Sequence, residues 1–350
     1  MDTIEINNYG LSSSIFIESS LDRLNKLLPS SNVIIVIDDL VNSIYGDLFS
    51  AYKRIAVHSG ETVKTLDTVV DITAKLIELE ADRHTFILGV GGGIVCDITG
   101  FVASTYMRGV RFGFLPTTLV AQVDAAIGGK NGVNFQRFKN IIGTFNQPEF
   151  VLCDVRFLKT LPERELNAGF AEIIKYGLIS DKSIIEDVDQ NHSLYMNCDQ
   201  NAFAELILKC VTIKANVVNQ DVNEKGLRKI LNFGHTIGHA IEKISSDYIH
   251  GEAISIGMVI AMKISESEGN ISGSDTKRIC ALLQKYKLPV AIDKQLFPSL
   301  ITSLTADKKR NESLIDFVVL KQFGEAVILT ISFTELSGLL DNISFSDTGN

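Results

Sequence analysis

Three of the six histidines of this chain fall within sixteen residues. The segment Asn232-Phe-Gly-His-Thr-Ile-Gly-His-Ala-Ile-Glu242 carries His235 and His239, and His250 follows in His250-Gly-Glu252. On a helix, residues four apart share one face, and we expect His250 to return from the loop after it. Zinc chemistry uses imidazoles together with a carboxylate and an open coordination position. The segment therefore indicates half of a metal site.

Nearby residues bear on this interpretation. Gly234 and Gly238 leave space for a bulky group against the backbone of the histidine helix. Glu172 and Lys175 lie three residues apart on another predicted helix, a spacing equally typical of a plain surface ion pair. Separate histidines with ordinary hydrogen bonds are the alternative to a metal site. The third histidine favours the metal, and Glu172 is the carboxylate that the histidine pair lacks.

A glycine-rich turn predicts a second kind of site. The run Thr85-Phe-Ile-Leu-Gly-Val-Gly-Gly-Gly-Ile-Val-Cys-Asp97 reads as a strand, three glycines and a helix start. Such a turn lets backbone N–H groups approach a phosphate at the helix N-terminus, although a merely tight connection has the same pattern. Glu61 follows the strand-like run 54–57, where a carboxylate can bind ribose hydroxyls or simply stabilise a helix start.

Cations, amides and glycines without helical apolar spacing gather between residues 106 and 140. We interpret this stretch as an anion-binding rim, whose polar members are Arg108, Thr117, Thr118, Asp124, Lys130, Lys139 and Asn140. Lys214 follows later in the chain. Arg228, Asn232 and His235 recur at helical spacing, so a carboxylate-binding arginine, a hydroxyl-binding amide and a metal ligand are expected on one pocket wall.

The elements that must position these residues change character along the chain. Short β-branched runs alternate with helical patterns as far as Asp154, which predicts βαβ units and a parallel sheet. Long helical periodicities follow. We therefore expect an α/β domain over residues 1–155 and a mostly helical domain over residues 156–350. Thr160 is expected to cap the first helix of the second domain, with Pro162 and Glu163 in its first turn.

Composition excludes several classes of protein. The formal net charge of -9 argues against a general nucleic-acid or anionic-membrane surface. The five cysteines are scattered without a C-x-x-C pair, as expected for reduced thiols in a cytosolic protein. The N-terminus lacks the pattern of a signal peptide, and no apolar stretch is long enough to span a bilayer. These features predict a cytoplasmic protein.

Taken together, six ordered blocks between Gly60 and Glu252 resemble the 3-dehydroquinate synthases, which are sugar phosphate cyclases. The blocks are Gly91-Gly-Gly with Asp97, Pro116-Thr-Thr118, Asp124 with Gly128-Gly-Lys130, Lys139-Asn140 with Gly143, Glu172 with Lys175, and the histidine segment with His250-Gly-Glu252. The resemblance implies an NAD-binding α/β domain with a Rossmann-like parallel sheet and a helical domain, with zinc or cobalt in a cleft between them. It also implies a homodimer.

Carried over residue by residue, the resemblance assigns roles to individual positions. It implies that Glu172, His235 and His250 bind the metal, and that Glu224, His239 and Lys130 are catalytic. The implied NAD contacts are Glu61, Lys64, Gly92, Gly93, Asp97, Thr117, Thr118, Asp124, Lys130, Lys139 and Thr160. The implied substrate contacts are Arg108, Asp124, Lys130, Lys139, Asn140, Lys175, Lys214, Arg228 and Asn232, with one further lysine at Lys308 or Lys309.

The reaction implied is the conversion of 3-deoxy-D-arabino-heptulosonate 7-phosphate to 3-dehydroquinate and phosphate. It proceeds through transient oxidation by NAD, β-elimination of phosphate, re-reduction and an intramolecular aldol closure. Alternatives are a 2-deoxy-scyllo-inosose synthase, a metal-dependent polyol dehydrogenase and a catalytically silent binding protein. Arg228 and Asn232 disfavour the first, because a neutral sugar end does not require a carboxylate-binding arginine. The family pattern is poorly matched near Asp38 and Asp39, at the adenosine end of the NAD site.

Overall fold

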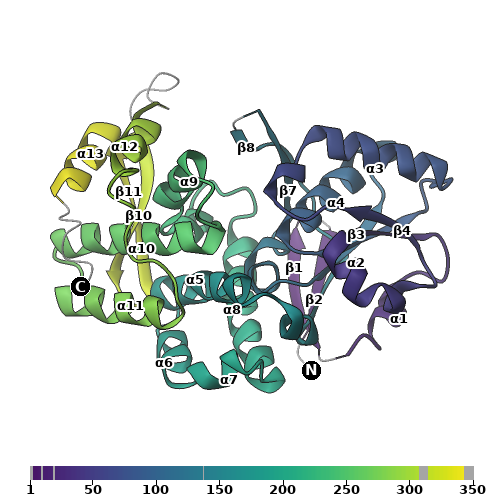
Figure 1. Cartoon of the computed structure of the whole chain (residues 1–350), viewed down its shortest axis with the longest axis horizontal. Helices are drawn as coiled ribbons and strands as arrows, with labels where there is room; N and C mark the ends of the chain where they lie inside the picture. The colour runs from purple at the N-terminus through teal and green to yellow at the C-terminus, as the bar shows by residue number, and fades with distance from the viewer. Residues whose placement is uncertain (1–2, 9–10, 19, 137, 307–313, 343–350) are drawn as a thin grey trace. The chain divides into compact units, whose positions relative to one another are not determined.

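The chain forms two compact units. The computed structural model describes residues 3–8, 11–18, 20–136, 138–306 and 314–342 (Figure 1). Unit 1 comprises Met1–Pro162 and Met196–Asn223, and unit 2 comprises Glu163–Tyr195 and Glu224–Asn350.

Unit 1 is built on a seven-stranded sheet with the order β1-β2-β9-β6-β5-β3-β4. Its neighbouring strands are parallel except for the antiparallel pair β1–β2. The central strands β3 and β5 are apolar and buried along nearly their whole length, as expected for parallel strands covered on both faces. The strands are β1 (Ile4–Asn8), β2 (Leu11–Glu18), β3 (Val33–Asp38), β4 (Lys53–Val57), β5 (Phe86–Gly91), β6 (Arg111–Pro116) and β9 (Phe150–Asp154).

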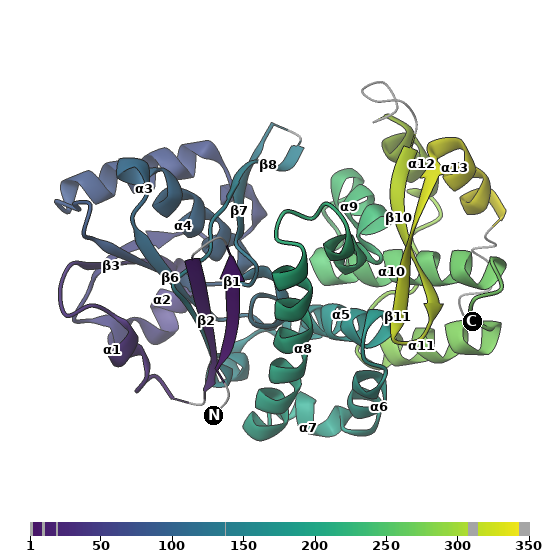
Figure 2. The same cartoon turned by 180° about the vertical axis from the view of Figure 1, so that it is seen from behind.

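Helices cover both faces of this sheet. Alternate residues of β3 and β5, such as Ile35 and Leu88, form one core together with α1 and α2. Helix α4 packs against β5, β6 and β3 from the opposite side, as Figures 1 and 2 show. The helices are α1 (Leu24–Leu27), α2 (Asp39–Tyr45), α3 (Leu66–Glu78), α4 (Gly93–Thr105) and α8 (Gln200–Gln220), with short turns η1 (Gly46–Phe49), η2 (Glu61–Val63), η3 (Tyr106–Arg108), η4 (Ala121–Ala125) and η5 (Val155–Thr160). A separate antiparallel hairpin joins β7 (Lys130–Phe135) and β8 (Phe138–Phe145).

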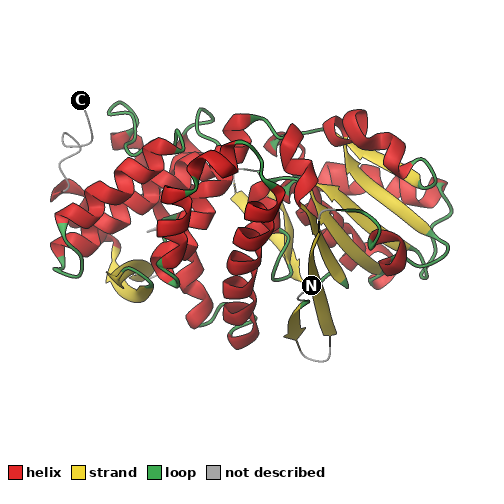
Figure 3. Cartoon of the chain, turned by 90° about the horizontal axis from the view of Figure 1, so that it is seen from below, coloured by secondary structure: helices red, strands yellow, loops and turns green. Residues whose placement is uncertain are grey.

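Unit 2 is mainly helical, and Figure 3 shows how few strands it contains. Helix α10 carries an almost continuous series of buried residues and packs against α5, α9 and α11. The elements are α5 (Glu163–Ile179), α6 (Ser183–Gln190), α7 (His192–Met196), η6 (Leu227–Asn232), α9 (His235–Ile244), α10 (His250–Ser267), α11 (Gly273–Lys285), α12 (Phe297–Ala306), β10 (Leu314–Gln322), β11 (Glu325–Ser332) and α13 (Phe333–Asn342). The predicted fold class, a mostly parallel α/β domain followed by a helical region, is confirmed.

The division of the chain differs from the predicted boundary at residue 155. The break falls after Pro162, and the segment with α8 returns to unit 1. Helix α8 packs against the edge strand β1 and its neighbour β2 (Figure 2). There the Asn219 side chain accepts a hydrogen bond from the Asn7 N–H at 2.9 Å and donates one to the Glu5 carbonyl at 3.1 Å. This pairing joins residues more than two hundred positions apart, which local periodicity does not reveal.

The predicted cap at Thr160 is wrong. Thr160 ends the 3-10 helix η5, and α5 begins at Glu163. The Thr160 hydroxyl donates to the Phe157 carbonyl at 3.3 Å and lies 2.9 Å from the Tyr45 hydroxyl.

Within the described part of the chain, no helix is long and apolar enough to cross a membrane.

Candidate active site

The glycine-rich turn joins β5 to α4 in unit 1. Gly92 is the N-cap of α4, and no side chain caps the helix there. A Cβ on Gly91 would lie 2.8 Å from the Val95 Cβ, and one on Gly92 would lie 3.1 Å from the Thr118 Cγ2. Only glycine lets the backbone run this close to its neighbours. The N–H groups of the first turn of α4 therefore suit an anion such as a phosphate.

Lys64 and Asp97 form a buried ion pair beside this turn. The Lys64 Nζ lies 2.5 Å from the Asp97 Oδ2, and the side chains are 7% and 18% exposed. Burial raises the pKa of the Asp97 carboxyl above its ordinary value, although the Lys64 ammonium lowers it. Glu61 accepts a hydrogen bond from the Asn134 Nδ2 at 2.8 Å and lies 3.7 Å from the Lys139 Nζ. These contacts bring four of the predicted NAD contacts into two adjacent pairs.

Asp124 and Lys214 form the next pair in unit 1. The Lys214 Nζ donates to the Asp124 carbonyl and to its Oδ1, both at 2.7 Å. Thr117 is buried, and its N–H donates to the Gly91 carbonyl at 2.9 Å. Three further predicted residues, Arg108, Lys130 and Asn140, are exposed on η3 and the β7–β8 hairpin.

Asp38 ends β3 at the carboxyl edge of the sheet, and Asp39 begins α2. Asp38 caps α2 by accepting from the Leu40 and Val41 N–H groups. The Ser59 hydroxyl donates to both carboxylates, at 2.8 and 2.9 Å, and the His58 Nδ1 lies 2.7 Å from the Asp39 Oδ2. The structure thus shows polar groups at an edge where nucleotides settle in such sheets, a cluster that the sequence pattern left undefined.

Glu172, His235 and His250 meet in unit 2. Helices α5, α9 and α10 supply one residue each, and one potential ligand atom from each lies within 4.8 Å of the other two. The Glu172 Oε1 lies 3.5 Å from the His235 Nε2 and 3.2 Å from the His250 Nε2. Tetrahedral zinc with bonds of roughly 2.0–2.1 Å places its ligand atoms about 3.3 Å apart. The spacing therefore fits a zinc-sized ion.

Both imidazoles are held by their second nitrogen. The His235 Nδ1 donates to the Phe233 carbonyl at 3.1 Å, which directs the Nε2 lone pair toward Glu172. The His250 Nδ1 lies 3.4 Å from the Glu242 Oε1. Metal-binding histidines are commonly oriented in this way by a carbonyl or a carboxylate. Glu242 was not among the predicted site residues, although its position seven residues after His235, on the same helix face, was the available signal.

The local charges also suit a cation. Burial lowers the pKa of His235 to about 3, which keeps this imidazole neutral and available as a ligand. At His250 burial also lowers the pKa, but the carboxylates of Glu172 and Glu242 outweigh it and raise the pKa to about 10. A metal ion would take the place of the proton on the His250 Nε2. By geometry, orientation and donor chemistry, these three residues fit the metal that the sequence predicts.

Other predicted residues of unit 2 lie near this cluster in the chain. The His239 ring centroid is 5.3 Å from that of His235 and 6.3 Å from that of His250. His239, Glu242 and His250 form a second group of possible ligands, but His239 is exposed. The Asn232 Nδ2 donates to the Glu224 carboxylate at 2.6 Å. Arg228 is 2% exposed.

Several expectations about this segment are wrong. Glu172 and Lys175 do form an ion pair, but it is buried rather than on the surface. His250 is the first residue of α10 rather than part of a loop. Arg228 and Asn232 lie on the 3-10 helix η6, which is separated from α9 by Gly234 with φ 78°. They therefore do not share one continuous helix face with His235.

The two glycines of the histidine segment accommodate a helix rather than a ligand. A Cβ on Gly234 would lie 2.6 Å from the Met258 Cγ, and one on Gly238 would lie 2.6 Å from the Ile254 Cδ1. The bulky group near the backbone is therefore α10 itself. Lys308 and Lys309 lie outside the described residues.

Comparison with known proteins agrees with these observations. Residues 54–168 match the 3-dehydroquinate synthase N-terminal family, and residues 169–310 match the 3-dehydroquinate synthase C-terminal family. The chain is 41% identical over 344 residues to a 3-dehydroquinate synthase of Desulforamulus reducens, covering 94% of this chain and 96% of that protein.

Two solved structures are also similar. A 2-epi-5-epi-valiolone synthase from Streptomyces hygroscopicus, with NAD+ and Zn2+ bound, is 26% identical with a TM-score of 0.88, covering 97% of this chain and 99% of that one. A 2-deoxy-scyllo-inosose synthase complexed with carbaglucose-6-phosphate, NAD+ and Co2+ is 26% identical with a TM-score of 0.82 and the same coverage, 97% and 99%. The fold and these similarities place the chain among the sugar phosphate cyclases. Within that class, the chain belongs to the 3-dehydroquinate synthase family.

Proposed function

We propose that the protein converts 3-deoxy-D-arabino-heptulosonate 7-phosphate to 3-dehydroquinate and inorganic phosphate. The main support for this proposal is the Glu172–His235–His250 cluster in a chain of the 3-dehydroquinate synthase family. The proposed cofactors are NAD and one zinc or cobalt ion.

The proposed metal site lies in unit 2. Glu172, His235 and His250 would hold a divalent cation, which would supply Lewis acidity toward the substrate hydroxyls. Glu172 supplies a negative charge, and the Lys175 ammonium offsets the cost of burying it. The Phe233 carbonyl and Glu242 hold the imidazoles in the orientation that directs each Nε2 toward the Glu172 carboxylate.

The proposed NAD site lies in unit 1. NAD supplies a reversible hydride acceptor, so the reaction has no net redox change. The α4 N-terminus, with Gly92 and Gly93, would hold the phosphates of NAD, while Lys64 fixes the Asp97 carboxylate beside the turn. The remaining NAD contacts proposed are Glu61, Thr117, Thr118, Asp124, Lys130, Lys139 and Thr160.

The substrate is expected to meet both cations and amides. Arg228 presents a buried guanidinium suited to bidentate recognition of the substrate carboxylate. This group separates the proposed activity from that of 2-deoxy-scyllo-inosose synthase, whose substrate lacks a carboxylate. The other substrate contacts proposed are Arg108, Asp124, Lys130, Lys139, Asn140, Lys175, Lys214 and Asn232.

Proton transfers are assigned to Glu224 and His239, with Lys130 as a further catalytic group. Asn232 holds the Glu224 carboxylate in place at 2.6 Å. His239 is exposed and near the metal cluster, so its imidazole is able to exchange protons with solvent. A catalytic group of this kind contributes roughly 10²–10⁴-fold to rate.

We also propose that the protein is cytoplasmic and forms a homodimer. A single size measurement by light scattering tests the dimer, and a monomer at working concentrations would exclude it.

The activity is tested by incubating metal-loaded protein with NAD and the substrate. Released phosphate, 3-dehydroquinate and NADH absorbance are followed in one reaction. We expect phosphate and 3-dehydroquinate in equal amounts without lasting NADH, because NAD is regenerated in each turnover. Steady NADH growth on a simple polyol would instead indicate a dehydrogenase, and absence of phosphate release with metal and NAD bound would exclude this substrate.

A further inference from the structure

Two helices of unit 2 meet along a short, matched series of contacts. On α5, Arg164, Ala168 and Glu172 follow one another at intervals of four residues and so lie on one face. On α10, the first three residues are His250, Gly251 and Glu252. Each of these contacts one member of the α5 series, in reverse order along the chain.

The three contacts differ in kind. The His250 Nε2 lies 3.2 Å from the Glu172 Oε1, within the proposed metal site. A Cβ on Gly251 would lie 2.1 Å from the Ala168 carbonyl oxygen, so the two backbones touch there. Glu252 binds Arg164 through two hydrogen bonds, from the Arg164 Nε to Oε1 at 2.7 Å and from Nη2 to Oε2 at 2.6 Å.

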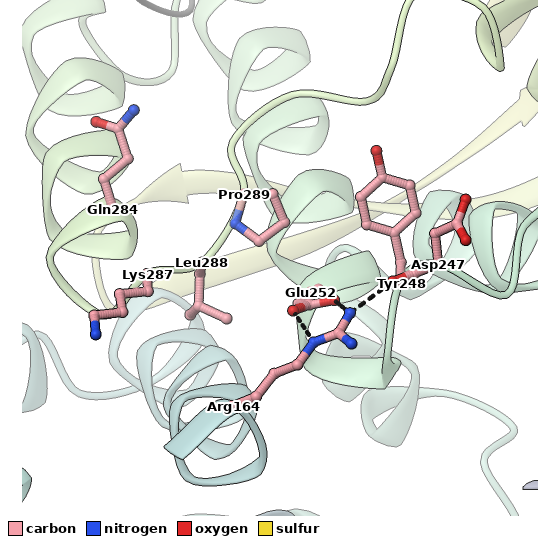
Figure 4. Close-up of a pocket in the computed structure, with 8 residues that line it drawn as sticks. All are labelled: Arg164, Asp247, Tyr248, Glu252, Gln284, Lys287, Leu288 and Pro289. Atoms are coloured by element: carbon pink, nitrogen blue, oxygen red, sulfur yellow. Dashed lines mark hydrogen bonds and ion pairs between the residues drawn. The ribbon is translucent and has the colours of Figure 1, made fainter. Parts of the chain in front are cut away.

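Glu252 connects this ion pair to the beginning of the helix. Its Oε2 also accepts the Ile249 N–H at 3.0 Å, immediately before His250. The Arg164 Nη2 also donates to the Asp247 carbonyl at 2.6 Å, which fixes the loop leading into α10. Figure 4 shows Arg164 directed at Glu252 and toward this loop. The pair borders a pocket of about 450 Å³, and the Glu252 side chain is only 14% exposed.

A helix end is the least fixed part of a helix, because its first N–H groups lack partners within the helix. A metal ligand at the first residue of α10 therefore needs external restraint. We propose that Arg164 and Glu252 are positioning residues of the metal site, which hold the start of α10, and with it His250, against the face of α5 that carries Glu172. This inference rests on the proposed function, since it requires that Glu172, His235 and His250 bind a metal.

The test compares metal binding by Arg164→Ala, Arg164→Lys and Glu252→Gln with binding by the unaltered protein. The matched control is Arg111→Ala in unit 1. Arg111 and Glu149 form a similar two-bond pair, at 2.5 and 2.8 Å, with side chains 55% and 42% exposed. Zinc affinity is measured by competition with a chelator, and the visible absorption of bound Co2+ reports the coordination geometry.

We expect Arg164→Ala to weaken zinc binding by about 10-fold or more, since residues that orient metal ligands typically contribute 10–100-fold. Its Co2+ spectrum should also change. Arg164→Lys and Glu252→Gln should lose less, because each keeps part of the contact, and they carry the test if Arg164→Ala does not fold. Arg111→Ala should retain the affinity and spectrum of the unaltered protein.

Unchanged affinity and an unchanged Co2+ spectrum in all three Arg164 and Glu252 variants would overturn the inference. An equal loss in Arg111→Ala would also overturn it, because the effect would then be general destabilisation. If the unaltered protein binds no metal, both the inference and the proposed function fail. If the unaltered protein binds metal and the variants bind it equally well, only the inference fails.

Discussion

At the scale of single residues, the burial of charge is the decisive feature of unit 2. Glu172 is fully buried, Lys175 is 1% exposed and His235 is 8% exposed. A buried charge is costly unless it is paired or binds a metal. The cluster therefore combines a carboxylate, a neutral imidazole and a cationic imidazole. A divalent ion would replace the proton of the cationic imidazole and bind all three groups.

The division of roles among the histidines makes a testable distinction. His239→Asn should keep the metal, because Glu172, His235 and His250 remain, but should lower turnover by about 10²–10⁴-fold through loss of a proton-transfer group. His250→Ala should lose both metal and turnover. Metal content per chain and phosphate release are measured on the same preparations, and loss of metal from His239→Asn would make that residue a ligand instead.

The spacing of the histidines indicated a metal site, but spacing alone did not identify the carboxylate that completes it. His235 and His239 reveal a shared helix face by spacing, whereas Glu172 lies on a helix far earlier in the chain. Glu172 was considered because the histidine pair lacks a carboxylate, and the resemblance to a family then implied that it is a metal ligand. The Glu242 contact with His250 was missed, because His250 was expected in a loop and is instead the first residue of α10.

At the scale of elements, α9 and α10 approach each other through glycine. A Cβ on Gly257 of α10 would lie 2.0 Å from the Gly234 carbonyl oxygen. Both helices carry proposed metal ligands, His235 and His250. Close backbone contact thus fixes two ligands relative to one another.

Gly257→Ala should therefore separate the two helices. We expect a loss of about 1–3 kcal/mol in the free energy of unfolding, as is typical of overpacking, together with weaker zinc binding. Gly338→Ala on α13 is the control, since a Cβ there meets nothing within 4 Å. It should leave zinc binding unchanged and stabilise the protein by up to about 1 kcal/mol. Urea unfolding and zinc titration measure both effects, and wild-type zinc affinity in Gly257→Ala would contradict the account.

The N-terminus of α11 should give a pH-dependent contribution to stability. Hydrogen bonds from the Ser272 hydroxyl and N–H lower the pKa of Asp275 below its ordinary value of 3.8. Because the folded-state pKa is depressed, the stabilisation is present above the unfolded-state pKa and is lost as pH falls through the folded-state pKa. Asp275→Ala should cost about 0.3–1 kcal/mol at neutral pH, as is typical of an acidic group in the first turn of a helix, and little once the carboxyl is protonated. Urea unfolding across this range measures the difference, and a pH-independent difference would be evidence against it.

Hydrophobic periodicity predicted the central strands and the long helices. It failed where packing between distant segments determines the structure. The run of residues 85–97 contains the expected strand and helix start, as β5 and the beginning of α4, and Glu172 lies on a helix as expected, α5. The β10–β11 hairpin was not predicted, because a mostly helical domain was expected over residues 156–350. The return of α8 to unit 1 depends on contacts with β1 and β2, which no single segment encodes.

At the scale of the whole molecule, the two proposed cofactors belong to different units. The proposed metal ligands all lie in unit 2, and the proposed NAD contacts all lie in unit 1. A ligand stabilises the part of a protein that binds it. Each cofactor should therefore leave its own pattern of protection on the chain.

Hydrogen exchange is the measurement that resolves these patterns. Zinc should slow amide exchange in α9 and at the start of α10, and NAD should slow exchange around Gly92 and Thr118. Protection by zinc confined to unit 1 would contradict the assignment of the metal to unit 2.

The central claim is that Glu172, His235 and His250 hold a metal that the cyclase reaction requires. The most direct test adds zinc or cobalt stepwise to chelator-treated protein with NAD and 3-deoxy-D-arabino-heptulosonate 7-phosphate. Bound metal and phosphate release are recorded in the same sample, alongside Glu172→Ala. We predict that turnover rises with bound metal up to one ion per chain and that Glu172→Ala neither binds the ion nor turns over. Full phosphate release from metal-free protein, or from Glu172→Ala, would contradict the account.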